Sequence, residues 1–374
     1  MALTIKTAKA KTTVKSALES EKVLLALQKQ HGEQVAVKGG KFSPVPRIPL
    51  GIFPFDLATG GGIPRSRLTV FTGPESSGKS LNMYMAMVAV QRMGETAVLI
   101  DGEHAWDGEW GKAVGIDVGK LIVVQPSNAE QCVDAVEAFL YAKDVGIVGV
   151  DSVSAMVTEN EIKSEAGKMI VAGSAMMVTK MMHKAGIAFT EGSKVGHLPS
   201  LLCISQTRYE IGKLFGDPEK MTGGQCFKFT SSLTCRFYGK NVVVEEVNKS
   251  KPTFKHVQGV IKKYKCPIVG TAFEFNQCIL PHRGLGIGQV ESWNTVEAFL
   301  KAQGQLVKGK TNWLLFGQEY KTLDLIKTRC REDYQFRTKC ESAVAEMAVK
   351  IDTEPETKTK PKAKVDKATG EIVG

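Results

Sequence analysis

The segment "GPESSGKS", Gly73–Ser80, constrains the fold more than any other stretch of this chain. It matches the pattern G-x-x-x-x-G-K-[S/T] and lies between an apolar strand-like run, 68–71, and a helical run, 81–93. In such a loop the glycines let successive N–H groups point inward, the lysine reaches the β- and γ-phosphates, and the last hydroxyl ligates Mg²⁺. We therefore predict a nucleoside triphosphate site formed by Gly73, Pro74, Glu75, Ser76, Ser77, Gly78, Lys79 and Ser80, with Ser80 as a metal ligand.

The pattern around this loop predicts an α/β fold. From Leu68 to about residue 206, apolar strand-like runs alternate with helical stretches, which is typical of a mostly parallel sheet covered by helices on both faces. The later runs "SSLTCRFYGKNVVV", "FKHVQGVIKKYKC" and "TAFEFNQCIL" alternate like antiparallel strands and predict an extension of that sheet. A helical pattern at 14–31 precedes the core.

Changes in composition along the sequence predict four segments, and the net charge indicates the kind of partner. We expect a basic arm with an N-terminal helix at 1–40, an ATPase-like core at 41–283, a small α/β domain at 284–350 and a disordered basic tail at 351–374. The formal net charge of +10 favours an anionic partner such as nucleic acid. Eight scattered cysteines indicate reduced core residues of an intracellular protein. No apolar run reaches the roughly 18 residues of a membrane span, so we expect a cytoplasmic location.

Polar residues that end the predicted strands complete the candidate site. Asp151, at the end of "GIVGVDS", is the expected Mg²⁺-holding acid. Ser152 follows it, so the base that activates water must come from elsewhere; Glu103 is the candidate and Asp101 its competitor. Gln206 ends a third strand, where its amide is placed to contact the γ-phosphate.

A long basic stretch follows Gln206. Its lysines and arginine can neutralise backbone phosphates, while paired glycines allow close approach, so one hypothesis is a nucleic-acid-binding loop. The alternative is an active-site lid without nucleic acid. The candidate DNA-binding residues are Arg208, Lys213, Gly223 and Gly224.

Several motifs together resemble the RecA recombinases. They are "FDLATGGGIPRSRLTVFTGPESSGKS", "IDGEHAWD", "VDSVSAM", "ENEI" and "MTGGQCFKF", in the family's order and with similar spacing from about Leu18 to Phe275. The drift between motifs and the basic tail resemble a bacteriophage-encoded or otherwise diverged member.

The resemblance implies roles for residues on both sides of the nucleotide. Glu103 would be the base, Gln206 the γ-phosphate sensor, and 163–172 and 207–224 the two DNA-binding loops. Trp110 stands where the family usually has a tyrosine that stacks on adenine. Phe229 would transmit the nucleotide state across a subunit boundary, and Lys263 and Lys265 would reach the nucleotide of the neighbouring protomer.

The function implied by the resemblance is that of an ATP-dependent recombinase. Subunits would polymerise through the N-terminal helix on single-stranded DNA, with ATP and Mg²⁺ between protomers, and would then pair with duplex DNA and exchange strands. The alternatives are a hexameric helicase or translocase on the same core and a regulatory ATPase that exchanges no strands. The stretch 187–198, which precedes the Gln206 strand, has no role assigned from sequence.

Overall fold

The computed structural model describes residues 19–32, 35–36, 38–39, 44–164, 173–209, 219–221, 226–243, 252–282, 285–353, 364–365 and 372–373. These residues belong to two compact units, 1–45 and 46–374. Among them no helix is both long and apolar enough to cross a membrane.

The first unit contains one described helix, α1 (Glu19–His31). No residue of α1 is buried within the unit, and the side chains of Val23 and Leu25 are exposed. The predicted start of this helix, before residue 19, lies outside the described residues.

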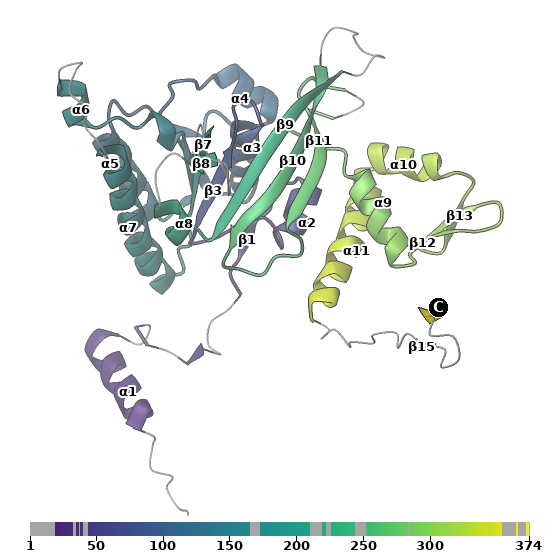
Figure 1. Ribbon diagram of the computed structural model, residues 1–374, viewed down its shortest axis with the longest axis horizontal. Coiled ribbons are helices and arrows are strands. Elements are labelled where there is room, and N and C mark those ends of the chain that lie inside the picture. The colour runs from purple at the N-terminus through teal and green to yellow at the C-terminus, as the bar shows by residue number, and fades with distance from the viewer. Residues whose placement is uncertain are drawn as a thin grey trace, which may run out of the picture. The chain divides into compact units, whose positions relative to one another are not determined.

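The second unit is built on a nine-stranded sheet with the order β11-β10-β9-β3-β7-β6-β4-β5, and β8 pairs with β7 (Figure 1). All pairings from β9 through β5 are parallel, while β10 runs antiparallel to both β9 and β11. This confirms the mostly parallel sheet and its antiparallel extension. The strand bounds are β3 Leu68–Gly73, β4 Thr96–Asp101, β5 Ile122–Val124, β6 Val145–Asp151, β7 Ser200–Tyr209, β8 Glu219–Met221, β9 Leu233–Val243, β10 Pro252–Tyr264 and β11 Ala272–Cys278, with a separate pair β1 Arg47–Ile48 and β2 Ile63–Pro64.

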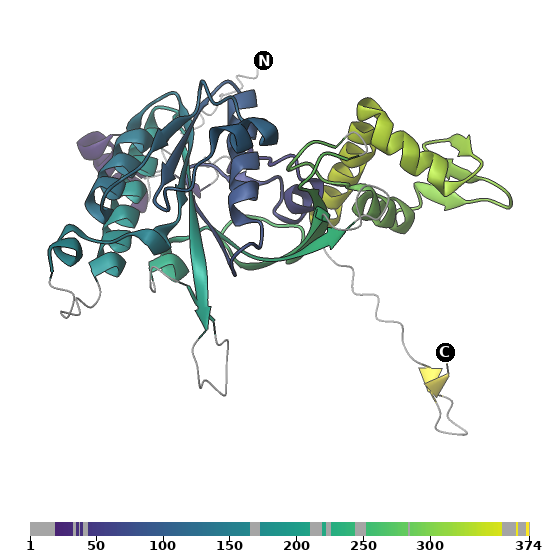
Figure 2. The same ribbon diagram turned by 90° about the horizontal axis from the view of Figure 1, so that it is seen from above.

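Helices cover the two faces of this sheet and create two cores (Figure 2). Because successive strand side chains point to opposite faces, Phe71 and Leu99 join one core while Val70 and Val98 join the other. The first core packs under α2 (Phe53–Ala58) and α3 (Lys79–Arg92), and the second under α5 (Ala129–Tyr141), α7 (Gly173–Lys194) and α8 (Cys226–Thr230). Shorter helices α4 (Gly108–Val114), η2 (Val153–Ala155) and α6 (Glu159–Lys163) follow strand ends.

The stretch 187–198 is the last part of α7 and its turn into β7. Gly192 is buried there, and a Cβ at this position would lie 2.6 Å from the backbone oxygen of His197. The His197 ring, whose Nε2 lies 3.2 Å from the Leu140 oxygen, ties this turn to the end of α5. The stretch therefore has a structural place in the α5–α7 layer.

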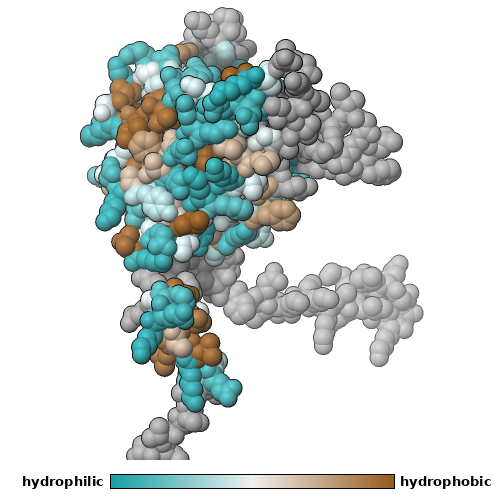
Figure 3. Space-filling view, turned by 90° about the vertical axis from the view of Figure 1, so that its left-hand side faces the viewer, coloured by the Kyte–Doolittle hydropathy of each residue, from teal (hydrophilic) through white to brown (hydrophobic). Residues whose placement is uncertain are grey.

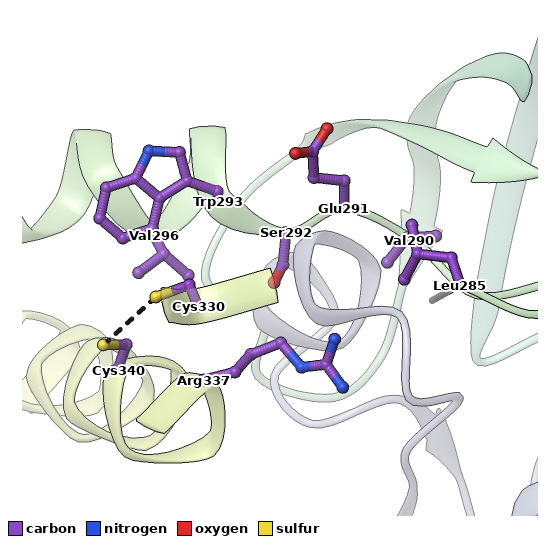
Figure 4. Close-up of a pocket in the computed structure, with 9 residues that line it drawn as sticks. All are labelled: Leu285, Val290, Glu291, Ser292, Trp293, Val296, Cys330, Arg337 and Cys340. Atoms are coloured by element: carbon purple, nitrogen blue, oxygen red, sulfur yellow. Dashed lines mark hydrogen bonds between the residues drawn. The ribbon is translucent and has the colours of Figure 1, made fainter. Parts of the chain in front are cut away.

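A third core lies in the C-terminal part of the second unit. It contains Cys330 and Cys340, whose sulfurs lie 3.8 Å apart beside a small pocket that Trp293 and Arg337 also line (Figure 4). Seven of the eight cysteines of the chain are buried, in agreement with their expected core positions. The elements are α9 Trp293–Ala302, β12 Leu306–Lys308, β13 Trp313–Leu315, β14 Gln318–Tyr320, α10 Leu323–Glu332 and α11 Tyr334–Thr353.

The predicted limits of this domain, 284–350, stay a prediction, because the compact division keeps it in one unit with the sheet. Helix α11 extends three residues beyond the predicted limit, to Thr353. Of the predicted disordered tail, the structure otherwise describes only the paired strands β15 (Lys364–Val365) and β16 (Ile372–Val373).

Candidate functional site

The phosphate-loop motif has the backbone that its sequence predicts. It connects β3 to α3, with Gly73 at φ +144° and Gly78 at φ +97°. These conformations favour glycine, and a Cβ on Gly73 would also come 2.2 Å from the Phe237 oxygen of β9. Ser76, at φ +55°, is a non-glycine residue in the left-handed region.

Lys79 is folded back under this loop. Its ammonium donates hydrogen bonds to the backbone oxygens of Gly73 (3.1 Å) and Pro74 (2.6 Å). Burial lowers the pKa of Lys79, and the carboxylates of Asp151 and Glu103 oppose that shift. The cation is thus held at the loop by carbonyl oxygens, which a phosphate can replace as acceptors.

The carboxylate of Asp151 lies next to the loop, at the end of β6. Burial raises the pKa of Asp151 to about 6, and a hydrogen bond with the Ser80 side chain opposes the shift. A hydroxyl and a carboxylate in contact fit Mg²⁺, which binds oxygen ligands and commonly takes only one or two from the protein beside phosphate and water. The structure therefore brings the two predicted metal ligands together.

Glu103 lies between two other strand ends. The backbone N–H groups of Gly102 and Glu103 donate hydrogen bonds to the backbone carbonyl oxygen of Asp151, at 2.8 and 3.2 Å. These bonds connect the end of β4 to the end of β6. The Glu103 Oε1 atom accepts hydrogen bonds from the Ser152 hydroxyl and from the Gln206 amide, the latter at 3.1 Å. The predicted base and the predicted sensor are thus in direct contact.

Two serines near these strand ends were missed as contributors by the sequence interpretation. The sequence shows of Ser152 only that it is not a glutamate. Ser154 accepts a hydrogen bond from the Gln206 backbone N–H at 3.0 Å. Their position within three residues after Asp151 is the only sequence signal for them.

Asp101, the competitor for the base, is engaged elsewhere. Its carboxylate accepts hydrogen bonds from the N–H groups of Ala105 (3.1 Å) and Trp106 (3.0 Å) and from the Gln125 amide (2.9 Å). The residue is 3% exposed. Asp101 therefore holds the turn that presents Glu103, and the geometry favours Glu103 as the residue facing the site.

Trp110 lies on α4, which packs against α3, the helix that follows the phosphate loop. The Asp107 side chain caps α4 by accepting from the Glu109 and Trp110 N–H groups. Trp110 remains 37% exposed. Its ring is thus accessible, while its predicted contact with adenine stays a prediction.

A second cluster, which we call the α8 patch, consists of Phe229, Lys263 and Lys265. The Lys265 ammonium donates to the Phe229 oxygen at 2.7 Å, the Lys263 ammonium donates to the Lys228 oxygen, and the Phe229 residue is 72% exposed. Burial, and then the charge of Lys265, lower the pKa of Lys263. The three residues predicted to act at a subunit boundary therefore lie together on one surface.

The α8 patch lies at the opposite end of the sheet from the phosphate loop. The Tyr264 end of β10 pairs with Leu233 of β9, and Leu233 pairs with Thr69 at the start of β3. The phosphate loop follows Gly73, at the other end of β3. The chain's own fold thus separates these lysines from its own phosphate loop.

Of the four predicted DNA-binding residues, Arg208 alone lies within the described residues. Arg208 lies on β7 and pairs with Lys220 of β8, so a short hairpin begins the segment 207–224. Lys213, Gly223 and Gly224 lie outside the described residues, as does nearly all of the segment 163–172. These assignments stay predictions.

The fold and the site define an α/β protein of the P-loop class. Residues 18–277 match the family model described as the RecA N-terminal domain. The chain is 35% identical over 216 residues to Protein RecA of Saccharopolyspora erythraea, covering 57% of this chain and 61% of that protein. It is 36% identical over 211 residues to Protein RecA of Chlorobaculum tepidum, covering 55% of this chain and 60% of that protein.

A eukaryotic relative gives a similar result. The mitochondrial DNA repair protein recA homolog of Dictyostelium discoideum is 33% identical over 252 residues, which are 63% of this chain and 55% of that protein. The chain belongs to the RecA family, and it spans between 55% and 61% of the length of these three relatives.

Proposed function

We propose that this protein is an ATP-dependent DNA recombinase that forms filaments on single-stranded DNA and promotes homologous pairing and strand exchange. The observation that carries the proposal is the convergence of Lys79, Asp151, Glu103 and Gln206 at one edge of the sheet in a RecA family member. The relatives are named RecA proteins or DNA repair proteins, which supports the same class of activity.

The proposed nucleotide site uses groups that are already close together. Lys79 would exchange the Gly73 and Pro74 oxygens for the β- and γ-phosphates, and Ser80 and Asp151 would hold Mg²⁺. When bound, Mg²⁺ would neutralise charge that develops on the phosphates. Glu103 would orient and deprotonate the attacking water.

Gln206 is proposed to couple nucleotide state to DNA. Its amide donates to Glu103 in this structure and would turn to the γ-phosphate when that group arrives. Gln206 lies on β7 directly before the predicted DNA-binding segment 207–224. A change in this contact would therefore be transmitted to the segment with Arg208, Lys213, Gly223 and Gly224, where basic side chains would bind phosphates of the DNA backbone.

The nucleotide is proposed to bind between protomers. Lys263 and Lys265 lie at the sheet end opposite the phosphate loop of their own chain, which supports a role at the nucleotide of a neighbouring chain. The exposed Phe229 would pack at the same boundary. Helix α1, which buries no residue in its own unit, supports assembly through the N-terminal unit.

The proposal is tested by ATP hydrolysis of the purified protein with and without single-stranded DNA, followed by a strand-exchange assay with homologous duplex. We expect strong stimulation by single strands and exchange that requires ATP. Stimulation with unwinding but no exchange would favour a helicase or translocase. Hydrolysis indifferent to DNA would overturn the recombinase and favour a regulatory ATPase.

A further inference from the structure

A second lysine contacts the phosphate loop. Lys255 lies on β10, far from the loop in sequence, and is half-buried. Its ammonium donates a hydrogen bond to the backbone oxygen of Ser76 at 2.6 Å. Lys79 binds the oxygens of Gly73 and Pro74, so the two lysines together bind three carbonyl oxygens of the loop.

The contact falls at a non-glycine residue of the loop whose backbone is in the left-handed region. Ser76 has φ +55°, a conformation that non-glycine residues adopt at a cost. A peptide group is planar and trans, so the oxygen of Ser76 and the N–H of Ser77 point in opposite directions. A donor that holds the Ser76 oxygen therefore also fixes the direction of the Ser77 N–H, one of the loop's candidate phosphate donors.

The strand that carries Lys255 is firmly placed against the loop. Lys255 pairs with Asn241 of β9, and nearby on β9 a Cβ at Gly239 would lie 2.9 Å from the Ser77 Cα atom. Val257, two residues along β10, approaches the Gly78 position. The β9–β10 pair is thus a platform under the loop, and Lys255 is its hydrogen-bonding contact with Ser76.

The charge of Lys255 has no anionic partner among the described contacts, which give its ammonium only the Ser76 oxygen. Burial lowers the pKa of Lys255. A partly buried ammonium that is hydrogen-bonded only to a carbonyl is favourably placed for a nearby phosphate anion.

We propose that Lys255 is a positioning residue of the nucleotide site, which fixes the Ser76–Ser77 peptide for phosphate binding and adds positive charge behind the loop. The inference rests on the proposed ATP site and adds a residue from outside the P-loop motif. Because Lys255 acts on the loop and lies on a different strand from Glu103, its loss weakens nucleotide binding and leaves the chemical step largely intact.

The test compares Lys255→Met, Lys255→Arg and the control Lys240→Met by equilibrium binding of a fluorescent ATP analogue without DNA and by steady-state hydrolysis with saturating single-stranded DNA. Lys240 is an exposed lysine of neighbouring β9, so its variant removes the same charge. We expect Lys255→Met to weaken binding and to raise KM about tenfold with kcat within about twofold. Lys255→Arg, which keeps a charged donor, restores binding to within about threefold, and Lys240→Met binds like wild type.

The outcomes separate the two proposals. No nucleotide binding by the wild type would overturn the proposed function itself. Wild-type binding together with unchanged binding by Lys255→Met would overturn only the role of Lys255, as would an equal loss in Lys240→Met. Thermal unfolding of each variant identifies a folding defect. If Lys255→Met is destabilised, nucleotide binding by Lys255→Arg is compared with that by Lys240→Met instead. If Lys255→Arg then binds nucleotide no better than the destabilised Lys255→Met, the proposal is contradicted.

Discussion

The phosphate-loop site and the α8 patch differ in the hydrogen-bond partners that a single chain gives their side chains. At the loop, Lys79, Glu103 and Gln206 all have hydrogen-bond partners within the chain. At the α8 patch, the exposed ring of Phe229 lies beside two lysines that bind only backbone oxygens of α8 in the described contacts. We therefore expect the first region to bind the nucleotide phosphates with groups of one chain, whereas the second has the exposure and charge expected of a surface that a partner completes.

Among the variants of the two regions, Lys79→Ala should cause the largest loss of ATP binding and activity. The variant loses the only cation that the described contacts place on the Gly73 and Pro74 oxygens, so ATP affinity should fall on the order of 100-fold or more, and hydrolysis and filament growth should stop. Titration with a fluorescent ATP analogue and light scattering on single-stranded DNA measure both. Filament growth that still depends on ATP in this variant would refute the assigned role of the loop.

Replacing Glu103 by alanine should separate binding from chemistry within the first region. We expect ATP affinity within about threefold of wild type and turnover reduced by about 10²–10⁴. Glu103→Gln is the matched variant, because its amide oxygen can still accept from Ser152 and Gln206. Normal hydrolysis in either variant would exclude Glu103 as the base and reopen the case for other groups.

Replacing Lys265 by alanine should affect the second region alone. A single chain should bind ATP normally, while DNA-stimulated hydrolysis should fall about tenfold, because under our proposal the charge would reach the neighbouring protomer's nucleotide only after assembly. The control is Lys228→Ala, which removes an exposed cation of α8 but keeps the backbone oxygen that Lys263 uses. Weakened ATP binding by the isolated Lys265 variant would contradict the proposed division between the two regions.

The sequence predicts the strand-end residues of the phosphate-loop site but not the contact of Lys255 with that loop. The sequence predicts the proximity of the loop, Asp151, Glu103 and Gln206, because carboxyl ends of parallel strands meet at one sheet edge, and in the structure these residues lie there together. The contact of Lys255 with Ser76 joins residues 179 positions apart. It depends on the register of antiparallel β9 and β10, which strand periodicity alone does not determine.

The hydrogen bonds of the serine hydroxyls next to Asp151 could not be predicted from the sequence either. Ser152 and Ser154 follow Asp151 in a short apolar stretch, and nothing in that stretch specifies that one donates to Glu103 and the other accepts from Gln206. Asp101 was a reasonable base by position, because it ends β4. Only the described turn shows that its oxygens are occupied by Ala105, Trp106 and Gln125.

The smallest expected effect is the pH dependence of stability that Asp56 contributes, outside both regions. It is a reference for the stability of variants in the two regions. The Asp56 carboxylate accepts N–H hydrogen bonds from Leu50 (2.8 Å) and Gly51 (2.9 Å), and burial raises its pKa from an ordinary 3.8 to about 7. Glu341 of α11 also raises this pKa. Because the folded state prefers the neutral acid, this contribution to stability is complete below about pH 4 and is lost as the pH rises through about 7.

We therefore expect the melting temperature of the wild type to decrease between pH 6 and 8 by about 1–2 °C from this residue. The effect is small because most of the loss falls between about pH 4 and 6, and because the large unfolding entropy of a long chain keeps the shift in melting temperature small. Asp56→Asn should melt lower at every pH, since its amide oxygen replaces only one of the two acceptors, and should show a flatter pH dependence. Differential scanning calorimetry at pH 5.5, 7 and 8.5 checks this. An unchanged slope in the Asn variant would assign the pH dependence to other groups, and ATP affinity that changed with this substitution would show that the stability of α2 is coupled to the phosphate loop.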